Sequence, residues 1–404
     1  MRQFDIPLRF QSPWITKIKQ KRKLQDPKKK DFAPTLLDLG DVSIALARHF
    51  GFCYGVENAI EIAYTALKEN PGKRVFLLSQ LIHNPLVNAD LQENGISFVQ
   101  DTEGNLLMNW EDLSCEDILV IPAFGTTLET EEKIKTLGLK TKVYDSTCPF
   151  VEKVWKKSEK LAEQNYTVII HGKANHEETK ATFSHTQAYT KTLIIKDMQE
   201  AKQLLAYVLH EKPAELFFEE FAGKYSQGFD PAIDLGKIGV VNQTTMLAEE
   251  TQAIADFFKQ SLLEKHGQNY LQYFADTRDT LCYATNDNQT ATYALLETDL
   301  DVIFVVGGYN SSNTSHLVEL CEKKCPSYFI ENASCLQSLQ SIAHYDIHHK
   351  ITKNSIDYLP THRPLRIAVT AGASCPDAEV ERVLRTLVDF LKPSIDISNC
   401  LEKL

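Results

Sequence analysis

Short apolar runs alternate along most of the chain with longer stretches in which apolar residues recur at helical spacing. A short run bounded by turn residues indicates a buried strand, whereas a longer amphipathic stretch indicates a helix. The expected strands are Val75–Leu78, Ile118–Ile121, Thr167–Ile170, Ile238–Val241, Val302–Val306 and Ile367–Thr370. Each run leads through a polar or glycine-containing loop into a helical stretch, and this order predicts the α/β class.

The stretch Ser43–Ala59 shows the pattern most clearly. An apolar run is followed by Gly51-Phe52-Cys53-Tyr54-Gly55 and then by a helical pattern, which predicts strand, tight turn and helix. Cys53 is thereby placed where a strand ends and a helix begins. That edge of an α/β sheet gathers ligands, because the first helical N–H groups lack partners and the helix dipole favours negative charge there. A thiolate suits this position.

Two later cysteines stand in the same context. Cys148 follows an expected strand at Lys142–Asp145 and precedes a helix at Phe150–Glu163, and Cys282 precedes a helix expected at Gln289–Glu297. The spacings are 148 − 53 = 95 and 282 − 148 = 134 residues, each about one small domain. For any one of these cysteines taken alone, a buried structural thiol is the better interpretation. Their shared context favours a common site.

These spacings predict three α/β domains between two end segments. The expected ranges are 1–40 for an N-terminal extension, 41–147, 148–280 and 281–390 for the three domains, and 391–404 for a C-terminal tail. The extension carries a basic run between Lys17 and Lys30. We interpret it as a solvated surface segment, with a targeting or polyanion-binding arm as the alternative.

The bulk composition excludes several classes of protein. The 404 residues are 43% hydrophobic and 24% charged, with a net charge of −11, so a general nucleic-acid surface is not expected. No apolar run approaches the length of a membrane span. The nine cysteines lack the density of a disulfide scaffold, and we find no signal-peptide pattern. We therefore expect a reducing compartment, the cytoplasm by default.

Several loops carry candidate acid–base groups. His83 follows the strand at Val75–Leu78, and the stretch His171–Thr179 holds His171, His176, Glu177 and Glu178. The latter group fits zinc binding, acid–base work, anion binding or a polar loop with one capping carboxylate. Two interpretations fit the loop after Ile238–Val241. Either Thr244 binds a ligand, or Thr245 is the N-cap of the next helix.

Two loops in the last third have the composition of phosphate-binding loops. Gly307–Thr314 includes Ser311, Ser312 and Asn313, and Ala371–Asp377 includes Ser374. Small residues let the backbone approach a ligand, and hydroxyl and amide groups donate hydrogen bonds to it. The helix N-terminus supplies positive potential. An anion site is expected here. Three thiolates nearby would hold zinc with one open position or, given their wide spacing, a cubane iron–sulfur cluster with one iron lacking a cysteine ligand.

The chain resembles the LytB/IspH family, the 4-hydroxy-3-methylbut-2-enyl diphosphate reductases. The resemblance rests on GFCYGVENAI, HNPLVNADLQENG, DSTCPFVEKV, NHEE, NQTTML, DTLCYAT, NSSN and TAGASCPD, which follow one another between about residues 43 and 390. It implies three similar α/β domains in a trefoil around a central [4Fe–4S] cluster. The implied reaction is reductive dehydroxylation of an allylic diphosphate to isopentenyl and dimethylallyl diphosphate, the last step of the non-mevalonate (MEP) isoprenoid pathway.

The resemblance also implies roles for individual residues. Cys53, Cys148 and Cys282 would bind the cluster, and Glu178, Thr244 and His176 would be catalytic. The substrate would be bound by His83, His176, Thr244, Ser311, Ser312, Asn313 and Ser374. The electron donor would be ferredoxin or flavodoxin, and neither nucleic acid nor membrane is an expected partner.

One position departs from the family pattern. Phe124, in Ala123-Phe124-Gly125, stands where many members have histidine, and its ring can neither donate to phosphate nor relay a proton. This form resembles the cyanobacterial and plant branch of the family. Two rival hypotheses remain: a zinc-dependent phosphoester hydrolase using His171, His176 and Glu178, and a structural metalloprotein whose cysteines only join domains.

Overall fold

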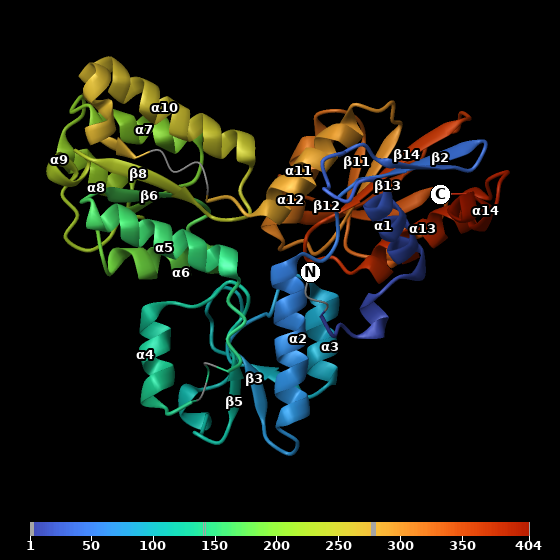
Figure 1. Cartoon of the computed structure of the whole chain (residues 1–404), viewed down its shortest axis with the longest axis horizontal. Coiled ribbons are helices and arrows are strands. Elements are labelled where there is room, and N and C mark those ends of the chain that lie inside the picture. The colour runs from blue at the N-terminus through green and yellow to red at the C-terminus, as the bar shows by residue number, and fades with distance from the viewer. Residues whose placement is uncertain (1–3, 140, 142, 276–279, 404) are drawn as a thin grey trace. The chain divides into compact units, whose positions relative to one another are not determined.

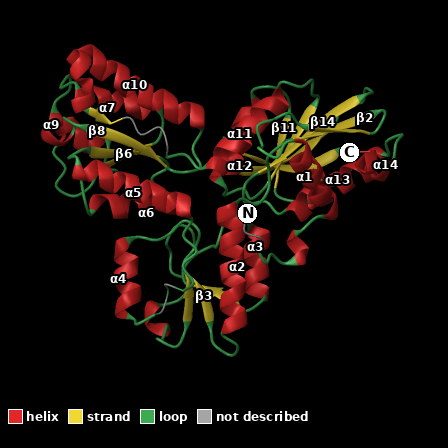
Figure 2. Ribbon diagram, in the orientation of Figure 1, coloured by secondary structure: helices red, strands yellow, loops and turns green. Residues whose placement is uncertain are grey.

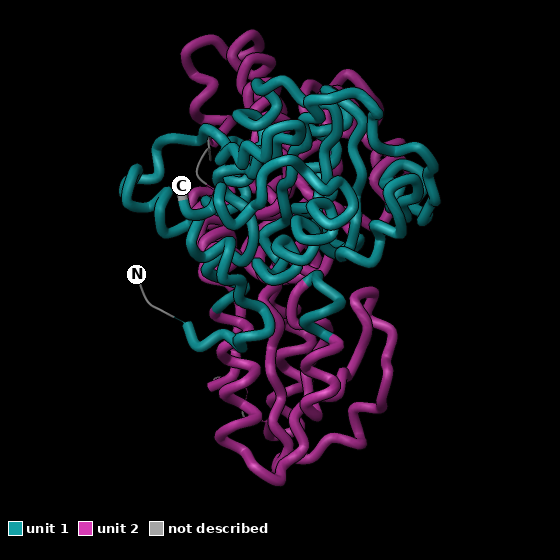
Figure 3. The backbone as a smooth tube through the Cα atoms, turned by 90° about the vertical axis from the view of Figure 1, so that its right-hand side faces the viewer, with its two compact units in different colours: residues 1–57, 83–88, 283–404 teal, residues 58–82, 89–282 magenta. Residues whose placement is uncertain are grey.

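The computed structural model describes residues 4–139, 141, 143–275 and 280–403 (Figure 1). These residues form three sheets flanked by helices (Figure 2), which confirms the predicted α/β class. The chain divides into two compact units (Figure 3): residues 1–57, 83–88 and 283–404 form the first, and residues 58–82 and 89–282 form the second. No helix among the described residues is long and apolar enough to cross a membrane. The domain boundaries given above remain predictions.

The first unit contains a seven-stranded sheet in the order β1-β2-β14-β10-β11-β12-β13. Its four central strands are parallel to one another, and an antiparallel strand or hairpin closes each edge. The strands are β1 Thr35–Asp38, β2 Val42–Leu46, β10 Val302–Val306, β11 Ser327–Ile330, β12 Ser341–Asp346, β13 Ile351–Ile356 and β14 Leu365–Ala371. Every residue of β10 is buried, as expected for a parallel strand covered on both faces.

The N-terminal extension packs onto this unit. Helix α1 spans Pro13–Gln25, and Ser12 is its N-cap, because its hydroxyl accepts the N–H of Ile15. Ile15 and Ile18 of this helix are buried. The Ser12 hydroxyl also donates to Glu381, and Lys19 forms an ion pair of 2.7 Å with Asp377. The extension is therefore more than a solvated segment here: one face of this helix is packed, while Lys17 and Lys23 on the helix remain exposed.

The remaining helices that lie wholly in the first unit are α11 Tyr283–Leu296, α12 Ser312–Glu322, α13 Asp377–Leu391 and α14 Ile397–Lys403. Helices α2 (Tyr54–Glu69) and α3 (Pro85–Glu93) begin in the first unit and continue in the second. Short 3₁₀ helices occur at Leu8–Phe10, Trp110–Asp112, Ala214–Leu216, Gly267–Gln272 and Ala333–Cys335.

The second unit contains two parallel sheets. One is β4-β3-β5, with β3 Val75–Leu77, β4 Ile96–Phe98 and β5 Ile118–Val120, followed by α4 Leu128–Thr136. The other is β7-β6-β8-β9, with β6 Thr167–His171, β7 Thr192–Ile195, β8 Ile238–Asn242 and β9 Phe274–Ala275. Its helices are α5 Pro149–Glu163, α6 Glu177–Gln187, α7 Met198–Val208, α8 Phe217–Glu220, α9 Pro231–Asp234 and α10 Ala248–His266.

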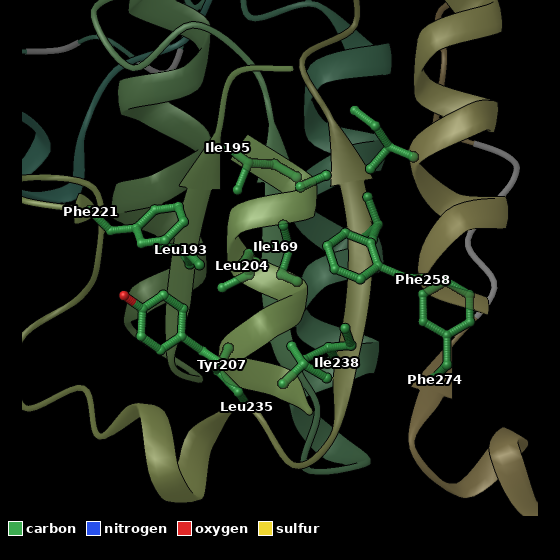
Figure 4. Close-up of a cluster of buried hydrophobic side chains, with 14 of the residues drawn as sticks. Ile169, Leu193, Ile195, Leu204, Tyr207, Phe221, Leu235, Ile238, Phe258 and Phe274 are labelled. Carbon is green, nitrogen blue, oxygen red and sulfur yellow. The ribbon is translucent and has the colours of Figure 1, made fainter. Parts of the chain in front are cut away.

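Alternation along the strands of the four-stranded sheet creates two separate cores. Ile169 and Val240 point to one face and join a cluster with Leu204 of α7 and Phe258 of α10 (Figure 4). Their neighbours along the strands, among them Ile170, point to the other face and pack with residues of α5. Because successive side chains in a strand face opposite ways, both faces of this sheet must be covered by helices.

Three local expectations differ from the structure. Helix α11 begins at Tyr283, directly after Cys282, and not at Gln289. Of the strand expected at Lys142–Asp145, Lys142 lies outside the described residues, and Asp145 makes only a single parallel bridge to Ile121. Helix α10 begins at Ala248 after Leu247, so Thr245 is not its N-cap.

Replacing Phe258 by alanine should destabilise the second unit strongly. Phe258 is 0% exposed in the α7/α10 core, so truncation leaves a cavity that costs about 3–5 kcal/mol. Phe218→Ala is the matched control, because that ring is 41% exposed and its loss should cost much less. Urea denaturation of both variants measures the difference; equal losses would contradict the described core.

Candidate functional site

The loops after β6 and β8 bring a buried carboxyl group against a threonine. Glu178 is 2% exposed in the first turn of α6. Its Oε1 accepts the backbone N–H of Thr244 at 2.5 Å, and its Oε2 accepts the Thr244 hydroxyl at 2.9 Å. Burial raises the pKa of Glu178 to about 7, although both Thr244 bonds pull it down. A carboxyl group with this pKa can hold or release a proton near neutral pH.

The Gln243 side chain holds the two loops together. Its Oε1 accepts the Thr179 hydroxyl at 3.0 Å and the Lys173 N–H at 3.1 Å, and its Nε2 donates to Thr245 at 2.7 Å. Asn242 accepts the hydroxyl of Thr280, two residues before Cys282. The end of β8 therefore positions Thr244 and also the segment that carries Cys282.

His176 is the N-cap of α6, and its hydrogen bond fixes its tautomer. Nδ1 accepts the N–H of Glu178 at 3.2 Å, so in the neutral ring the proton must be on Nε2. The Phe124 ring meets the imidazole edge to face, with centroids 5.7 Å apart and planes at 87°. Phe124 thus packs against the ring instead of supplying a second imidazole at this position.

Glu177 forms a connection that the sequence reading did not find. The hydroxyl of Ser79, just after β3, donates to Glu177 Oε1 at 2.5 Å. This bond links the end of the three-stranded sheet to the start of α6 within the second unit. Nothing in the sequence distinguishes Glu177 from Glu178 in this respect, because the partner lies 98 residues away.

Cys148 and Cys282 both lie in the second unit, each directly before a helix. Cys148 is the N-cap of α5 and its thiol makes no capping bond, while its N–H donates to the carbonyl of Ala123. Burial raises the pKa of Cys148 to about 12, with the nearby Cys282 and Glu178 adding to the shift. Such a thiol becomes a thiolate at neutral pH only when a cation or metal compensates the charge.

The first unit contains an anion cradle at the N-terminus of α12. The side-chain atoms Ser312 Oγ and Asn313 Nδ2 are buried and have no hydrogen-bond partner. Ser311 Oγ accepts both the N–H and the hydroxyl of Thr314, which leaves its own proton available to donate. Buried polar groups are almost always paired, so open donors at a helix N-terminus are suited to binding an anion.

Two glycines allow the loops of this cradle to approach one another. A Cβ on Gly372 would lie 1.9 Å from Thr314 Oγ1, and one on Gly308 would lie 2.7 Å from the carbonyl oxygen of His83. The Ser374 hydroxyl donates to the same His83 carbonyl at 3.0 Å. Ser374 therefore orients the His83 segment beside the cradle.

Ala373 connects the cradle to Cys53. Its N–H donates to Asn313 Oδ1 at 2.9 Å, and its carbonyl accepts the N–H of Cys53 at 3.2 Å. Alanine carries no chemical signal of its own, so sequence reasoning missed this link. The four predicted residues Ser311, Ser312, Asn313 and Ser374 are thus gathered with His83 and Cys53 in the first unit, while Glu178, Thr244, His176, Cys148 and Cys282 are gathered in the second.

Within the described residues, no three His, Cys, Asp or Glu side chains are grouped so that they would hold a metal ion. His171, a zinc ligand in the hydrolase hypothesis, is fully buried and bonded through Nδ1 to Thr251 at 3.0 Å. The hydrolase alternative therefore has no support in the structure. None of the nine cysteines, all of which lie in the described part of the chain, is in a disulfide bond.

The raised pKa of Glu178 predicts a pH dependence of stability. The folded state keeps the Glu178 proton up to pH about 7, whereas the ordinary pKa of this side chain in an unfolded chain is 4.5. Between these values the folded state binds more protons, so its free energy of unfolding should fall as pH rises, by up to about 3 kcal/mol. Urea denaturation at several pH values measures this slope. Glu178→Gln should abolish it and Glu177→Gln should keep it; an unchanged slope in Glu178→Gln would contradict the assignment.

Comparison with known proteins confirms the resemblance. The LytB protein family matches residues 44–388. The 4-hydroxy-3-methylbut-2-enyl diphosphate reductase of Picosynechococcus sp. is 40% identical over 349 residues, covering 86% of this chain and 84% of that protein. The chloroplastic reductase of Botryococcus braunii is 38% identical and covers 86% and 69%.

Two solved structures are similar in fold. One, titled as the (E)-4-hydroxy-3-methyl-but-2-enyl diphosphate reductase that ends the non-mevalonate pathway, aligns with a TM-score of 0.50 at 25% identity, over 87% of this chain and all of that one. The Plasmodium falciparum reductase aligns with a TM-score of 0.63 at 24% identity, over 86% and 88%. With its family match and curated relatives, the chain belongs to the LytB/IspH family.

Proposed function

We propose that this chain reduces 4-hydroxy-3-methylbut-2-enyl diphosphate to isopentenyl and dimethylallyl diphosphate, as its relatives are named to do. The observation that carries the proposal is the anion cradle, in which Ser312 Oγ and Asn313 Nδ2 are buried without partners. A diphosphate group would supply the missing acceptors. Each such bond to a charged group is worth more than a neutral one, so the cradle favours a doubly or triply charged ligand.

The binding residues have distinct tasks in this proposal. Ser311, Ser312 and Asn313 donate to phosphate oxygens at the N-terminus of α12, where the helix dipole adds positive potential. Ser374 holds the His83 segment in place. His176 offers an Nε2–H donor, because its Nδ1 is already an acceptor. Together these residues would hold the substrate in one orientation, so that little orientational entropy remains to be lost during the reaction.

The proposed cofactor is a [4Fe–4S] cluster bound by Cys53, Cys148 and Cys282. The donor set fits this group: none of the three cysteines is in a disulfide bond, and each directly precedes a helix. When bound, the cluster would supply single electrons and an iron without a cysteine ligand that acts as a Lewis acid.

Glu178 is the proposed source of protons. The reaction consumes two electrons and two protons: the C–O bond of the substrate hydroxyl breaks, the oxygen leaves as water, and a carbon of the allylic skeleton takes the other proton. Glu178 can deliver a proton to the departing oxygen because its pKa lies near 7, and Thr244 holds both its oxygens in place. Phe124 packs against His176 and supplies no imidazole of its own.

The electrons would come from a ferredoxin or a flavodoxin. Cytoplasmic location stays a prediction, since one relative is named as chloroplastic.

Anaerobic purification with iron and sulfide assays, followed by turnover of the diphosphate with a chemical reductant, tests the proposal as a whole. We expect near four irons and four sulfides per chain and formation of both products. Zinc without sulfide after attempted reconstitution would overturn it.

Removing a cradle donor should weaken substrate binding. Ser312→Ala deletes a hydroxyl that we assign to a phosphate oxygen, so the Kd for inorganic diphosphate and the KM for substrate should rise about tenfold or more. Ser315→Ala is the control, since that hydroxyl bonds the Ser311 carbonyl one turn further along the helix. Calorimetric titration compares the variants; unchanged affinity in Ser312→Ala would remove this residue from the site.

Neutralising Glu178 should stop turnover while binding persists. Glu178→Gln keeps the shape and can still accept the Thr244 N–H through its amide oxygen, while its NH2 group would donate to the Thr244 hydroxyl. It has no acidic proton to give, and general acid catalysis is typically worth about 10²–10⁴-fold in rate. Iron content and diphosphate affinity should equal those of the parent chain. Glu177→Gln, the adjacent carboxylate, should retain activity. A fully active Glu178→Gln enzyme would refute the proton-donor role.

A further inference from the structure

A cavity of about 530 Å³ opens beside Cys53 within the first unit. The segment from Arg48 to Tyr54 forms one wall, and the start of α11, with Tyr283, Asp287 and Asn288, forms another. The N-terminal extension supplies Phe4, Lys19, Lys23 and Lys29. No member of the cradle at α12 lines this cavity, so it is distinct from the proposed substrate site.

The extension brings strong positive charge to this place. Residues 17–30 contain eight Lys and Arg and one acid, Asp26, so their net charge is 8 − 1 = +7 in a chain whose total is −11. Lys17, Lys23, Lys28 and Lys30 are exposed. The extension also lies outside the region matched by the family, which begins at residue 44. It therefore adds a charged surface next to one of the proposed cluster ligands.

Arg48 gives the cavity an unsatisfied cationic wall. Its side chain is buried, 7% of the residue being exposed, and its Nε and Nη2 atoms have no hydrogen-bond partner. The Asp26 carboxylate is 3.9 Å from Nη2, beyond hydrogen-bond distance. The acids Glu57, Asp287 and Asp377 also line the cavity, but Asp377 is paired with Lys19. Arg48 therefore adds buried positive charge to the wall of the cavity.

We propose that this cavity and the basic segment 17–30 form the docking surface for an acidic electron-donor protein of the ferredoxin class. The inference rests on the proposed function, because it requires a redox group at Cys53. Opposite charges across an interface steer association and fix orientation, and electron-transfer contacts are small and weak, so a compact charged surface is sufficient. Acidic side chains of the donor would pair with the exposed lysines, and the buried charge of Arg48 would strengthen the attraction.

The distribution of charge favours a protein over a smaller or a polymeric anion. Lys17, Lys28 and Lys30 lie outside the set of cavity-lining residues, so a small phosphate in the cavity would leave them unused. A nucleic acid would bring its phosphates against the three acids that line the cavity, whereas a folded donor can place its own cations there. The partial exposure of Cys53 in the cavity wall suits a redox partner.

The test reverses charge at the surface and leaves the proposed catalytic residues untouched. One variant carries Lys23→Glu, Lys28→Glu and Lys30→Glu. The control carries Lys323→Glu, Lys324→Glu and Lys350→Glu, three exposed lysines of the same unit with the same change in net charge. Each chain is titrated with an oxidised plant-type [2Fe–2S] ferredoxin at low and high salt, and turnover is measured with reduced ferredoxin and with dithionite plus methyl viologen.

The basic-segment variant should bind ferredoxin about tenfold more weakly at low salt and lose most of its salt dependence, while the control binds like the parent chain. The turnover of this variant with the chemical reductant should be unchanged. Its KM for ferredoxin should rise in proportion to its loss of ferredoxin affinity. Equal affinities in all three chains, equal losses in both variants, or binding of inorganic diphosphate or DNA but not ferredoxin at this surface would overturn the docking proposal. Absence of turnover with either reductant in the parent chain would instead overturn the proposed function.

Discussion

Pairing between adjacent parallel strands is the constraint on which both halves of the candidate site depend. Strands β10 and β14 pair in parallel register, so the loops that follow them meet, and Ala373 can bond Asn313. Strands β6 and β8 pair in the same way, and Glu178 meets Thr244 at their common edge. Strands β3 and β5 do so again, with the Ala123 N–H donating to the Leu81 carbonyl. Residues far apart in sequence become neighbours because parallel strands end at one edge.

This constraint explains why so much could be read from the sequence. A buried parallel strand is a continuous apolar run, and the helix after it has its own period, so strands such as Val302–Val306 and the loops after them were located to within a residue or two. The residues with chemistry then lie in those loops by necessity. Ser312 and Asn313 were found because hydroxyl and amide side chains at a helix start have a recognisable purpose, and the structure leaves their donors open.

What the sequence did not reveal depends on contacts between remote segments. Ala373 and Glu177 act through a backbone group and through a partner 98 residues away, which no local pattern encodes. Thr245 resembled a cap, but its hydroxyl is used by Gln243 instead, and helix α10 begins later. The hairpin β12–β13 has mixed burial along its length and so lacks a clear apolar period. Helix α1 also lacks a clear apolar period, because Ile15 and Ile18 are its only buried residues.

The discontinuity of the first unit has a consequence for synthesis on the ribosome. Strand β2 takes Val42 into register with Leu365 of β14, and Ser12 bonds Glu381, 369 residues later. The second unit is a nearly continuous stretch, so it can fold as soon as it emerges, whereas β2 and α1 must wait for the end of the chain. Until then Ile15, Ile18 and the apolar strand remain uncovered. The nascent chain thus exposes the apolar residues of α1 and β2 until β14 and α13 have been made, and chaperone binding to these segments would protect them from aggregation.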